Sequence, residues 1–271
     1  MTDESEQGEE VLYEVSEGVA TLTLNRPERM NTISRPMLAL LAKLLIRANE
    51  DEAVRVIVLT GKGRAFCAGL DMNDATSGEG IGSEASAQAV SVNIDIRNTP
   101  PTVLFAMDKP TICALNGSAA GYGMDTAMGC DIRIAAESTK MAAAFVKRGL
   151  VPESGGTWIL PRLLGWSKAA KLIFTGATLS AAESLELGIV DEVVPNDRVQ
   201  TRARELALEI AANAPLAVQS SKRLMRMGLS EGFNDHVHHV YLQFLQLIRT
   251  EDFREGMTSF VERRAPDFKG R

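Results

Sequence analysis

Residues 110–130, PTICALNGSAAGYGMDTAMGC, carry the pattern that decides the fold. The segment opens with PTICALN, an almost continuous apolar run that is typical of a strand buried on both faces of a parallel sheet. A glycine-rich turn, NGSAAGYG, follows, and MDTAMGC starts a helix. A strand that runs through a glycine-rich turn into a helix indicates an α/β fold whose site lies at the C-terminal ends of the strands.

The same order of elements occurs upstream, where the apolar run VRVIVLT (54–60) leads into the glycine-rich GKGRAFCAGLDM (61–72). DIRIA (131–135) is a third predicted strand. At the N-terminus, VLYEV (11–15) and VATLTLN (19–25) alternate apolar and polar residues, which predicts two strands joined by a hairpin turn at Ser16-Glu17-Gly18. Leucines at helical spacing predict a helix over 36–49, and a further helical segment runs to about Asn98.

The C-terminal third is predicted to be mostly helical. SAAESLELG (180–188) is a helix, IVDEVV (189–194) is a short strand, and four helical stretches follow between 197 and 264. We therefore expect a disordered acidic tail over 1–10, a core domain over 11–195 and a helical oligomerisation region over 196–271.

Composition excludes several classes of function. The chain has 271 residues, a net charge of −6 and only three histidines, His236, His238 and His239, which lie within four residues of one another. Triads and metal sites that need separated histidines are excluded, so chemistry is expected to rest on carboxyl groups and backbone N–H groups. The acidic balance also argues against nucleic-acid partners and against binding to a membrane surface.

The ends of the chain and its cysteines point to the cytoplasm. The opening MTDESEQGEE is neither a signal nor a transit peptide, and no run reaches the roughly 18 apolar residues that span a bilayer. Cys67, Cys113 and Cys130 are odd in number and lack C-x-x-C spacing, which predicts free thiols in a reducing compartment.

Familiar motifs are absent from the glycine-rich turns. Neither turn fits G-x-G-x-x-G or a phosphate-binding loop, and Ser154 lacks the glycine that a nucleophile elbow requires two residues earlier. The histidine cluster has no H-E-x-x-H glutamate, so a solvated or interface helix is favoured over a metal site. What the two turns offer is a pair of backbone N–H groups that can polarise a carbonyl group and hold an oxyanion. The alternative is that the glycines only permit tight packing of strand on helix.

Four blocks of the sequence resemble the signatures of the enoyl-CoA hydratase/isomerase family, the crotonases. They are AFCAGLDM (65–72), NGSAAGYGMD (116–125), GLVPESGGT (149–157) and EDFREGMTSFVERRAPDF (251–268), and they cover nearly the whole chain in order. The resemblance implies an α/β fold of repeated β-β-α units in a superhelix, with a C-terminal helical trimerisation region. It also implies homotrimers or hexamers, and an acyl-CoA thioester whose carbonyl group lies between two backbone amides.

Carried over by position, the resemblance makes the amides of Leu70 and Tyr122 the oxyanion hole. Tyr122 stands where the family has a glycine, so the phenol ring must be accommodated. Further positions that resemble substrate or CoA contacts are Arg26, Arg29, Ala68, Gly69, Asp71 and Gly121. The two arginines are candidates for the phosphates of CoA, although surface arginines would look the same.

The acids decide the reaction. Two glutamates position water in the family's hydratases, and their places fall here on Asp125 and Phe145, so the second acid is missing. Asp125 lies at an apolar helix start, where desolvation would raise its pKa, and its alternative role is to stabilise the helix dipole. Glu153 falls where family isomerases move a proton. Its alternative role is to cap a helix beginning at Ser154.

We therefore expect double-bond isomerisation of an unsaturated acyl-CoA, with Glu153 as the acid/base. Hydration by Asp125 and Glu153, and acyl-CoA binding without turnover, are the alternatives. No metal or redox cofactor is expected, because CoA is part of the substrate. The acyl pocket is expected to be shaped by the variable segment 73–103.

Overall fold

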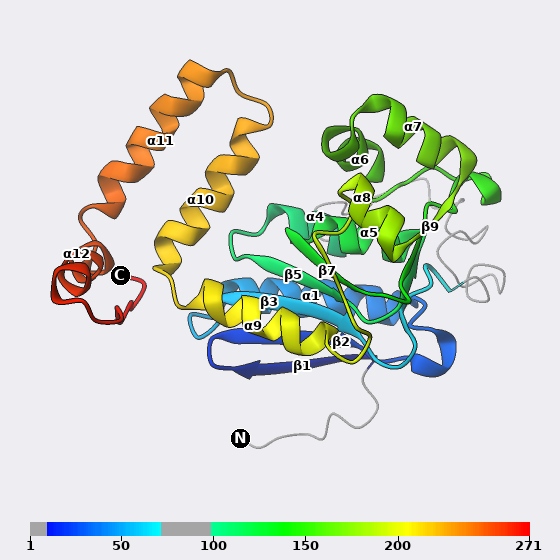
Figure 1. Ribbon diagram of the computed structural model, residues 1–271, viewed down its shortest axis with the longest axis horizontal. Helices are drawn as coiled ribbons and strands as arrows, with labels where there is room; N and C mark the ends of the chain where they lie inside the picture. Colours follow the sequence, from blue (N-terminus) through cyan, green and yellow to red (C-terminus); the bar gives the residue numbers. More distant parts are fainter. Residues whose placement is uncertain (1–9, 72–98) are drawn as a thin grey trace.

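The computed structural model describes residues 10–71 and 99–271. The predicted acidic tail apart from Glu10, the helical segment up to Asn98 and residues 73–98 of the variable segment lie outside the described residues. Figure 1 shows a layered α/β core from which a group of helices extends to one side.

The centre of the core is a six-stranded sheet in the order β1-β2-β3-β5-β7-β10. Its first two strands form the predicted antiparallel hairpin, and every other neighbouring pair is parallel. The strands are β1 (Val11–Ser16), β2 (Val19–Leu24), β3 (Val56–Gly61), β5 (Thr111–Leu115), β7 (Ile132–Ala136) and β10 (Glu192–Val194).

The apolar runs that predicted buried strands have a direct structural cause. In β3, Ile57 and Leu59 point into a large core on one face, whereas Val56 and Val58 point into a smaller core on the other. Successive side chains of a strand alternate between faces, so a strand covered on both sides needs apolar residues at nearly every position. The three cysteines are free thiols, as predicted, and all three are buried.

A second, smaller sheet was missed by the sequence analysis. Its order is β4-β6-β8-β9, formed by β4 (Ala65–Cys67), β6 (Ser118–Ala120), β8 (Lys140–Ala142) and β9 (Thr178–Ser180). The glycine-rich turns therefore contain strands of three residues, which are too short to show a period of two. β5-β6 followed by α5, and β7-β8 followed by α6, make repeated β-β-α units that contribute one strand to each sheet, in agreement with the predicted fold class.

Helices cover the large core. The predicted helix over 36–49 is confirmed, and Ser34 caps it by accepting a hydrogen bond from the Met37 amide. The helices of this part are α1 (Arg35–Glu50), α4 (Pro100–Ala106), α5 (Tyr122–Gly129), α6 (Gly156–Leu164), α7 (Trp166–Thr175) and α8 (Ala181–Leu187), with short 3-10 helices η1 (Pro27–Arg29) and η3 (Val146–Arg148).

The four predicted C-terminal helices are present as α9 (Val199–Ala211), α10 (Pro215–Gly228), α11 (Phe233–Leu247) and α12 (Glu251–Glu262). Helix α9 packs on the smaller core against β3, β5 and β7, while α10–α12 extend away from the sheets as an arm (Figure 1). The boundary proposed near residue 195 stays a prediction. Within the described residues, no helix combines the length and apolar character needed to cross a membrane.

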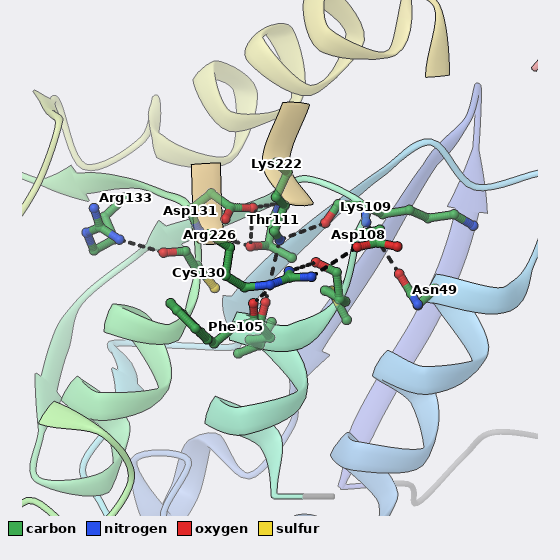
Figure 2. A network of polar contacts seen from close by, with 12 residues as sticks. Asn49, Phe105, Asp108, Lys109, Thr111, Cys130, Asp131, Arg133, Lys222 and Arg226 are labelled. Atoms are coloured by element: carbon green, nitrogen blue, oxygen red, sulfur yellow. Dashed lines mark hydrogen bonds and ion pairs between the residues drawn. The ribbon is translucent and has the colours of Figure 1, made fainter. Parts of the chain in front are cut away.

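Basic residues of α10 join the arm to the core, as Figure 2 shows. Lys222 Nζ donates to Asp131 Oδ2 over 2.7 Å, and Arg226 Nη2 donates to Asp108 Oδ1 over 3.1 Å. Arg226 Nη1 also donates to the carbonyl oxygens of Phe105 and Met107 at the end of α4. These contacts fix where α10 leaves the core.

Candidate active site

A pocket of about 70 Å³ opens where the second sheet meets the start of α5. The structure brings six of the predicted site residues to this pocket: Ala68, Gly69, Leu70, Gly121, Tyr122 and Glu153. The other lining residues are Ala120, Ala144, Phe145, Arg148 and Leu150. Asp125, Arg26, Arg29 and Asp71 do not line it.

The backbone amides of Leu70 and Tyr122 are the two donors expected at this pocket. The backbone of Ile33 bonds to the residues on either side of Leu70. The Ile33 amide donates to the Gly69 carbonyl over 2.8 Å, and the Ile33 carbonyl accepts from the Asp71 amide over 3.0 Å. Tyr122 is the first residue of α5, where helical amides have no partner in the preceding turn. Neither amide donates to a protein acceptor within the described part of the chain, so both can serve a ligand oxygen.

Glycine is required directly before each of these two residues. Gly69 has φ +105° and Gly121 has φ +52°, which are left-handed conformations that L side chains rarely adopt. A β carbon on Gly69 would lie 3.9 Å from the Tyr122 nitrogen, so the two loops meet here. Gly123 instead permits tight packing of helix on strand, since a β carbon there would lie 2.3 Å from the Cys67 carbonyl oxygen.

The Tyr122 ring is accommodated in the core, with only 6% of the residue exposed. Its hydroxyl group is buried and has no hydrogen-bond partner among the described residues. Burial, and secondarily the charge of Glu153, raise the pKa of this phenol. Tyr122 is therefore a neutral side chain, and its amide is left free at the helix start.

Glu153 lies on the loop between η3 and α6, at the mouth of the pocket. The residue is exposed to solvent, yet the protein around its carboxyl group desolvates it enough to raise the pKa. Helix α6 begins at Gly156 with Gly155 as its N-cap and no capping side chain. The alternative that Glu153 caps a helix beginning at Ser154 is therefore wrong.

Asp125 lies in the first turn of α5 and is only 1% exposed. Its Oδ2 accepts a hydrogen bond from the Ser154 amide over 3.2 Å. Desolvation by burial raises the pKa of this carboxyl group to about 7, against the opposing effect of the Ser154 and Gly156 amides and with a further rise from the charge of Glu153. The sequence predicted that desolvation at an apolar helix start would raise the pKa of Asp125, and the fold provides this desolvation.

Phe145 is the residue expected at the place of the second hydratase acid. It lines the pocket, is 5% exposed, and its Cε1 lies 4.0 Å from where a β carbon of Gly121 would be. The pocket wall at this position is therefore an aromatic ring.

The two arginines suggested for CoA contacts differ in how far other residues occupy their guanidinium groups. Arg26 donates to the Thr32 carbonyl over 2.7 Å and to Asp71 Oδ2 over 3.1 Å, and pairs with Glu10 over 3.1 Å, so its guanidinium group is occupied within the chain. Arg29 lies 3.6 Å from Asp71, and 41% of its side chain is exposed. Whether any of them contacts CoA stays a prediction.

Sequence reasoning missed Arg148 as a pocket residue. It is exposed at the end of η3, and its Nη1 donates to the Ala144 carbonyl over 3.2 Å. The basic pair Lys147-Arg148 directly before GLVPESGGT was the available signal.

The histidines lie on α11, in the arm. His236 and His239 each place Nδ1 about 3 Å from Glu231 Oε2, at 3.2 and 3.1 Å. In the part of the chain that the structure describes, no group of three or more His, Cys, Asp or Glu side chains is arranged to hold a metal ion.

The chain is similar to known proteins in both sequence and structure. A family model described as enoyl-CoA hydratase/isomerase matches residues 14–271. The 1,2-epoxyphenylacetyl-CoA isomerase of Escherichia coli is 37% identical over 264 residues, covering 96% of this chain and 98% of the relative. The 2,3-dehydroadipyl-CoA hydratase of Escherichia coli is 33% identical over 262 residues, covering 97% and 99%. A crystal structure of an enoyl-CoA hydratase from Bacillus anthracis superposes with a TM-score of 0.89 at 34% identity, covering 97% of this chain and 100% of the other.

Proposed function

The chain belongs to the enoyl-CoA hydratase/isomerase family, and we propose that it isomerises the double bond of an unsaturated acyl-CoA thioester with Glu153 as the acid/base. The observation that carries this proposal is the pocket itself. Its wall combines two free amides and one carboxyl group, and an aromatic ring stands where a hydratase would have its second acid.

The mechanism follows from these groups. The thioester carbonyl oxygen accepts hydrogen bonds from the Leu70 and Tyr122 amides, which stabilise the negative charge that develops on it. The Glu153 carboxylate takes a proton from the carbon next to the carbonyl group of a 3-enoyl-CoA, and the C–H electron pair becomes part of a dienolate. The same carboxyl group returns the proton to the far carbon of the former double bond, which yields the conjugated 2-enoyl-CoA and regenerates the carboxylate.

This proposal needs no further reactant. CoA enters as part of the substrate, and proton transfer alone balances the reaction, so we propose that the enzyme uses no metal and no redox cofactor. We further propose that it works in the cytoplasm, without nucleic-acid or membrane partners, in keeping with the net charge of −6.

Hydration is the second candidate, with Asp125 and Glu153 as the acids. The 2,3-dehydroadipyl-CoA hydratase among the relatives supports it. The burial of Asp125 away from the pocket lining disfavours it. Binding without turnover is the third candidate, because Tyr122 departs from the family's glycine and lines the pocket.

Purified protein and a 3-enoyl-CoA test the proposal. Wild type should generate the absorbance of a conjugated product, and Glu153→Gln should lower this rate by about 10²–10⁴-fold, because general acid–base catalysis contributes that much. Turnover that survives Glu153→Gln would remove Glu153 as the base.

A 2-enoyl-CoA distinguishes the alternatives. Hydration, seen as an added water in the mass of the product, that survives Glu153→Gln and is lost in Asp125→Asn would support a one-acid hydratase. Binding of the thioester without turnover of either substrate would support the non-catalytic alternative.

We also propose a homotrimer, or a hexamer made of two trimers. Large apolar side chains on the arm support it: Met225, Phe233, Phe260 and Val261 are each at least 74% exposed in the single chain. Burying such surfaces between subunits is a common route to stable oligomers.

A further inference from the structure

The two carboxyl groups near the pocket have different positions relative to it. Glu153 lines the pocket, whereas Asp125 is 1% exposed and is absent from the lining. Tyr122 lies one helical turn before Asp125 on α5, on the same face of the helix, and it does line the pocket. Asp125 is thus enclosed in the fold beside a residue that lines the pocket.

Asp125 contacts the backbone that carries Glu153. The Ser154 amide, which donates to Asp125 Oδ2 over 3.2 Å, belongs to the same peptide group as the Glu153 carbonyl. One oxygen of Asp125 thus holds the Glu153–Ser154 peptide.

The other oxygen of Asp125 lies against the start of α6. A β carbon on Gly156 would come within 2.4 Å of Asp125 Oδ1, so the backbone runs directly over the carboxyl group. Gly155 is the N-cap of α6 and offers no side chain, and it has φ +102°. The Asp125 carboxyl group thus lies at the start of α6, where the N-cap residue has no side chain of its own.

We propose that Asp125 is a positioning residue, which holds the Glu153–Ser154 peptide and the start of α6 so that the Glu153 carboxyl group faces the Leu70 and Tyr122 amides. On this account Asp125 exchanges no proton with the substrate. The inference rests on the proposed function, because it assigns the proton transfer to Glu153.

Hydrogen–deuterium exchange tests the positioning without any substrate. Asp125→Asn keeps an oxygen that can accept from the Ser154 amide, whereas Asp125→Ala removes it. We expect the amides of residues 154–156 to exchange faster in Asp125→Ala and at nearly the wild-type rate in Asp125→Asn. Met128→Ala, which removes another buried side chain from α5, is the matched control and should leave these amides protected.

Kinetics with a 3-enoyl-CoA test the role in the reaction. Asp125→Asn should keep kcat within about tenfold of wild type, since a direct acid or base would contribute 10²–10⁴-fold. Asp125→Ala should lower kcat by about 100-fold, because a displacement near 1 Å has that effect. The acidic limb of the kcat/KM pH profile, which reports Glu153, should persist in Asp125→Asn.

The inference is overturned if Asp125→Asn loses as much activity as Glu153→Gln while the 154–156 amides stay protected. Should Asp125→Ala fail to fold, the comparison of Asp125→Asn with Glu153→Gln decides alone. If Glu153→Gln retains full turnover, the proposed function fails, and the exchange result still shows whether Asp125 holds the loop.

Discussion

Glu153 and Asp125 influence each other electrostatically, yet their surroundings differ. Glu153 is exposed at the pocket mouth, and partial desolvation raises its pKa. Asp125 is enclosed, and burial raises its pKa to about 7. Glu153 lines the pocket and can face a substrate carbon, whereas the enclosed Asp125 accepts a hydrogen bond from the Ser154 amide.

The buried Asp125 predicts a pH dependence of stability. Between about pH 4 and pH 7 the unfolded chain ionises this group while the folded chain keeps it protonated, so the free energy of unfolding should fall as pH rises, by up to about 1.4 kcal/mol per pH unit from this group. Below that window the group is protonated in both states. Urea unfolding of wild type and Asp125→Asn from pH 4 to pH 8 measures the difference.

Asp125→Asn should lack this contribution. Its free energy of unfolding should therefore rise relative to that of wild type as pH rises to 7, and the difference between the two should then stay constant. Equal slopes for the two proteins would show that Asp125 keeps an ordinary pKa in the folded state.

The sequence predicted individual site residues where a local motif carries the signal. AFCAGLDM, NGSAAGYGMD and GLVPESGGT predicted Leu70, Tyr122 and Glu153 as partners, and they line one pocket. The bond from Ser154 to Asp125 joins residues 29 positions apart, and the contacts of Arg26 with Glu10 and Asp71 depend on how the chain folds back. No local pattern encodes such pairings.

The short second sheet brings the two glycine-rich turns together. β4 ends at Cys67 and β6 ends at Ala120, and the two strands are parallel neighbours, so the turns that follow them meet. Helix α5 then packs on β4 at Gly123 with no space for a side chain. The position of the Tyr122 amide therefore depends on this contact between helix and strand.

Gly123→Ala tests the contact. A methyl group would lie 2.3 Å from the Cys67 carbonyl oxygen, so we expect a loss of about 1–3 kcal/mol in the free energy of unfolding from overpacking. Gly256→Ala on α12 is the control, since the nearest atom to its added methyl group is 3.6 Å away. Equal stability of the two variants in urea unfolding would contradict close packing at Gly123.

Strand length explains which elements were predictable. β3 and β5 have five or six buried residues and appear in the sequence as apolar runs. β4 and β6 have three residues each, and their glycine neighbours gave the segments the appearance of turns. Their pairing is a property of the assembled fold.

The arm of α10–α12 is tied to the core at both ends. Arg55, just before β3, donates to the Ala211 carbonyl over 2.9 Å and to the Phe268 carbonyl over 2.6 Å, while the basic residues of α10 hold Asp108 and Asp131. These contacts leave the apolar side chains of the arm facing outward in the single chain. The composition of the C-terminal third predicted the helices, and the direction of the arm required the structure.

Light scattering tests the proposed oligomer. Wild type should have three or six times the mass of one chain. Phe260→Asp, at a residue that is 81% exposed on α12, should lower that mass, because a charge would be buried in the interface. Val15→Asp, at a residue that is 40% exposed on β1, is the control and should not change it. A monomeric wild type would contradict the proposal.

The central claim is that Glu153 removes a proton from a thioester held by the Leu70 and Tyr122 amides. Its most direct test is a 3-enoyl-CoA deuterated at the carbon next to the carbonyl group, followed by mass spectrometry and NMR with wild type and Glu153→Gln. The account predicts that wild type removes deuterium from this carbon and passes it to the far carbon or to solvent, and that Glu153→Gln does so at least about 100-fold more slowly. Removal of deuterium by Glu153→Gln at the wild-type rate would contradict the account.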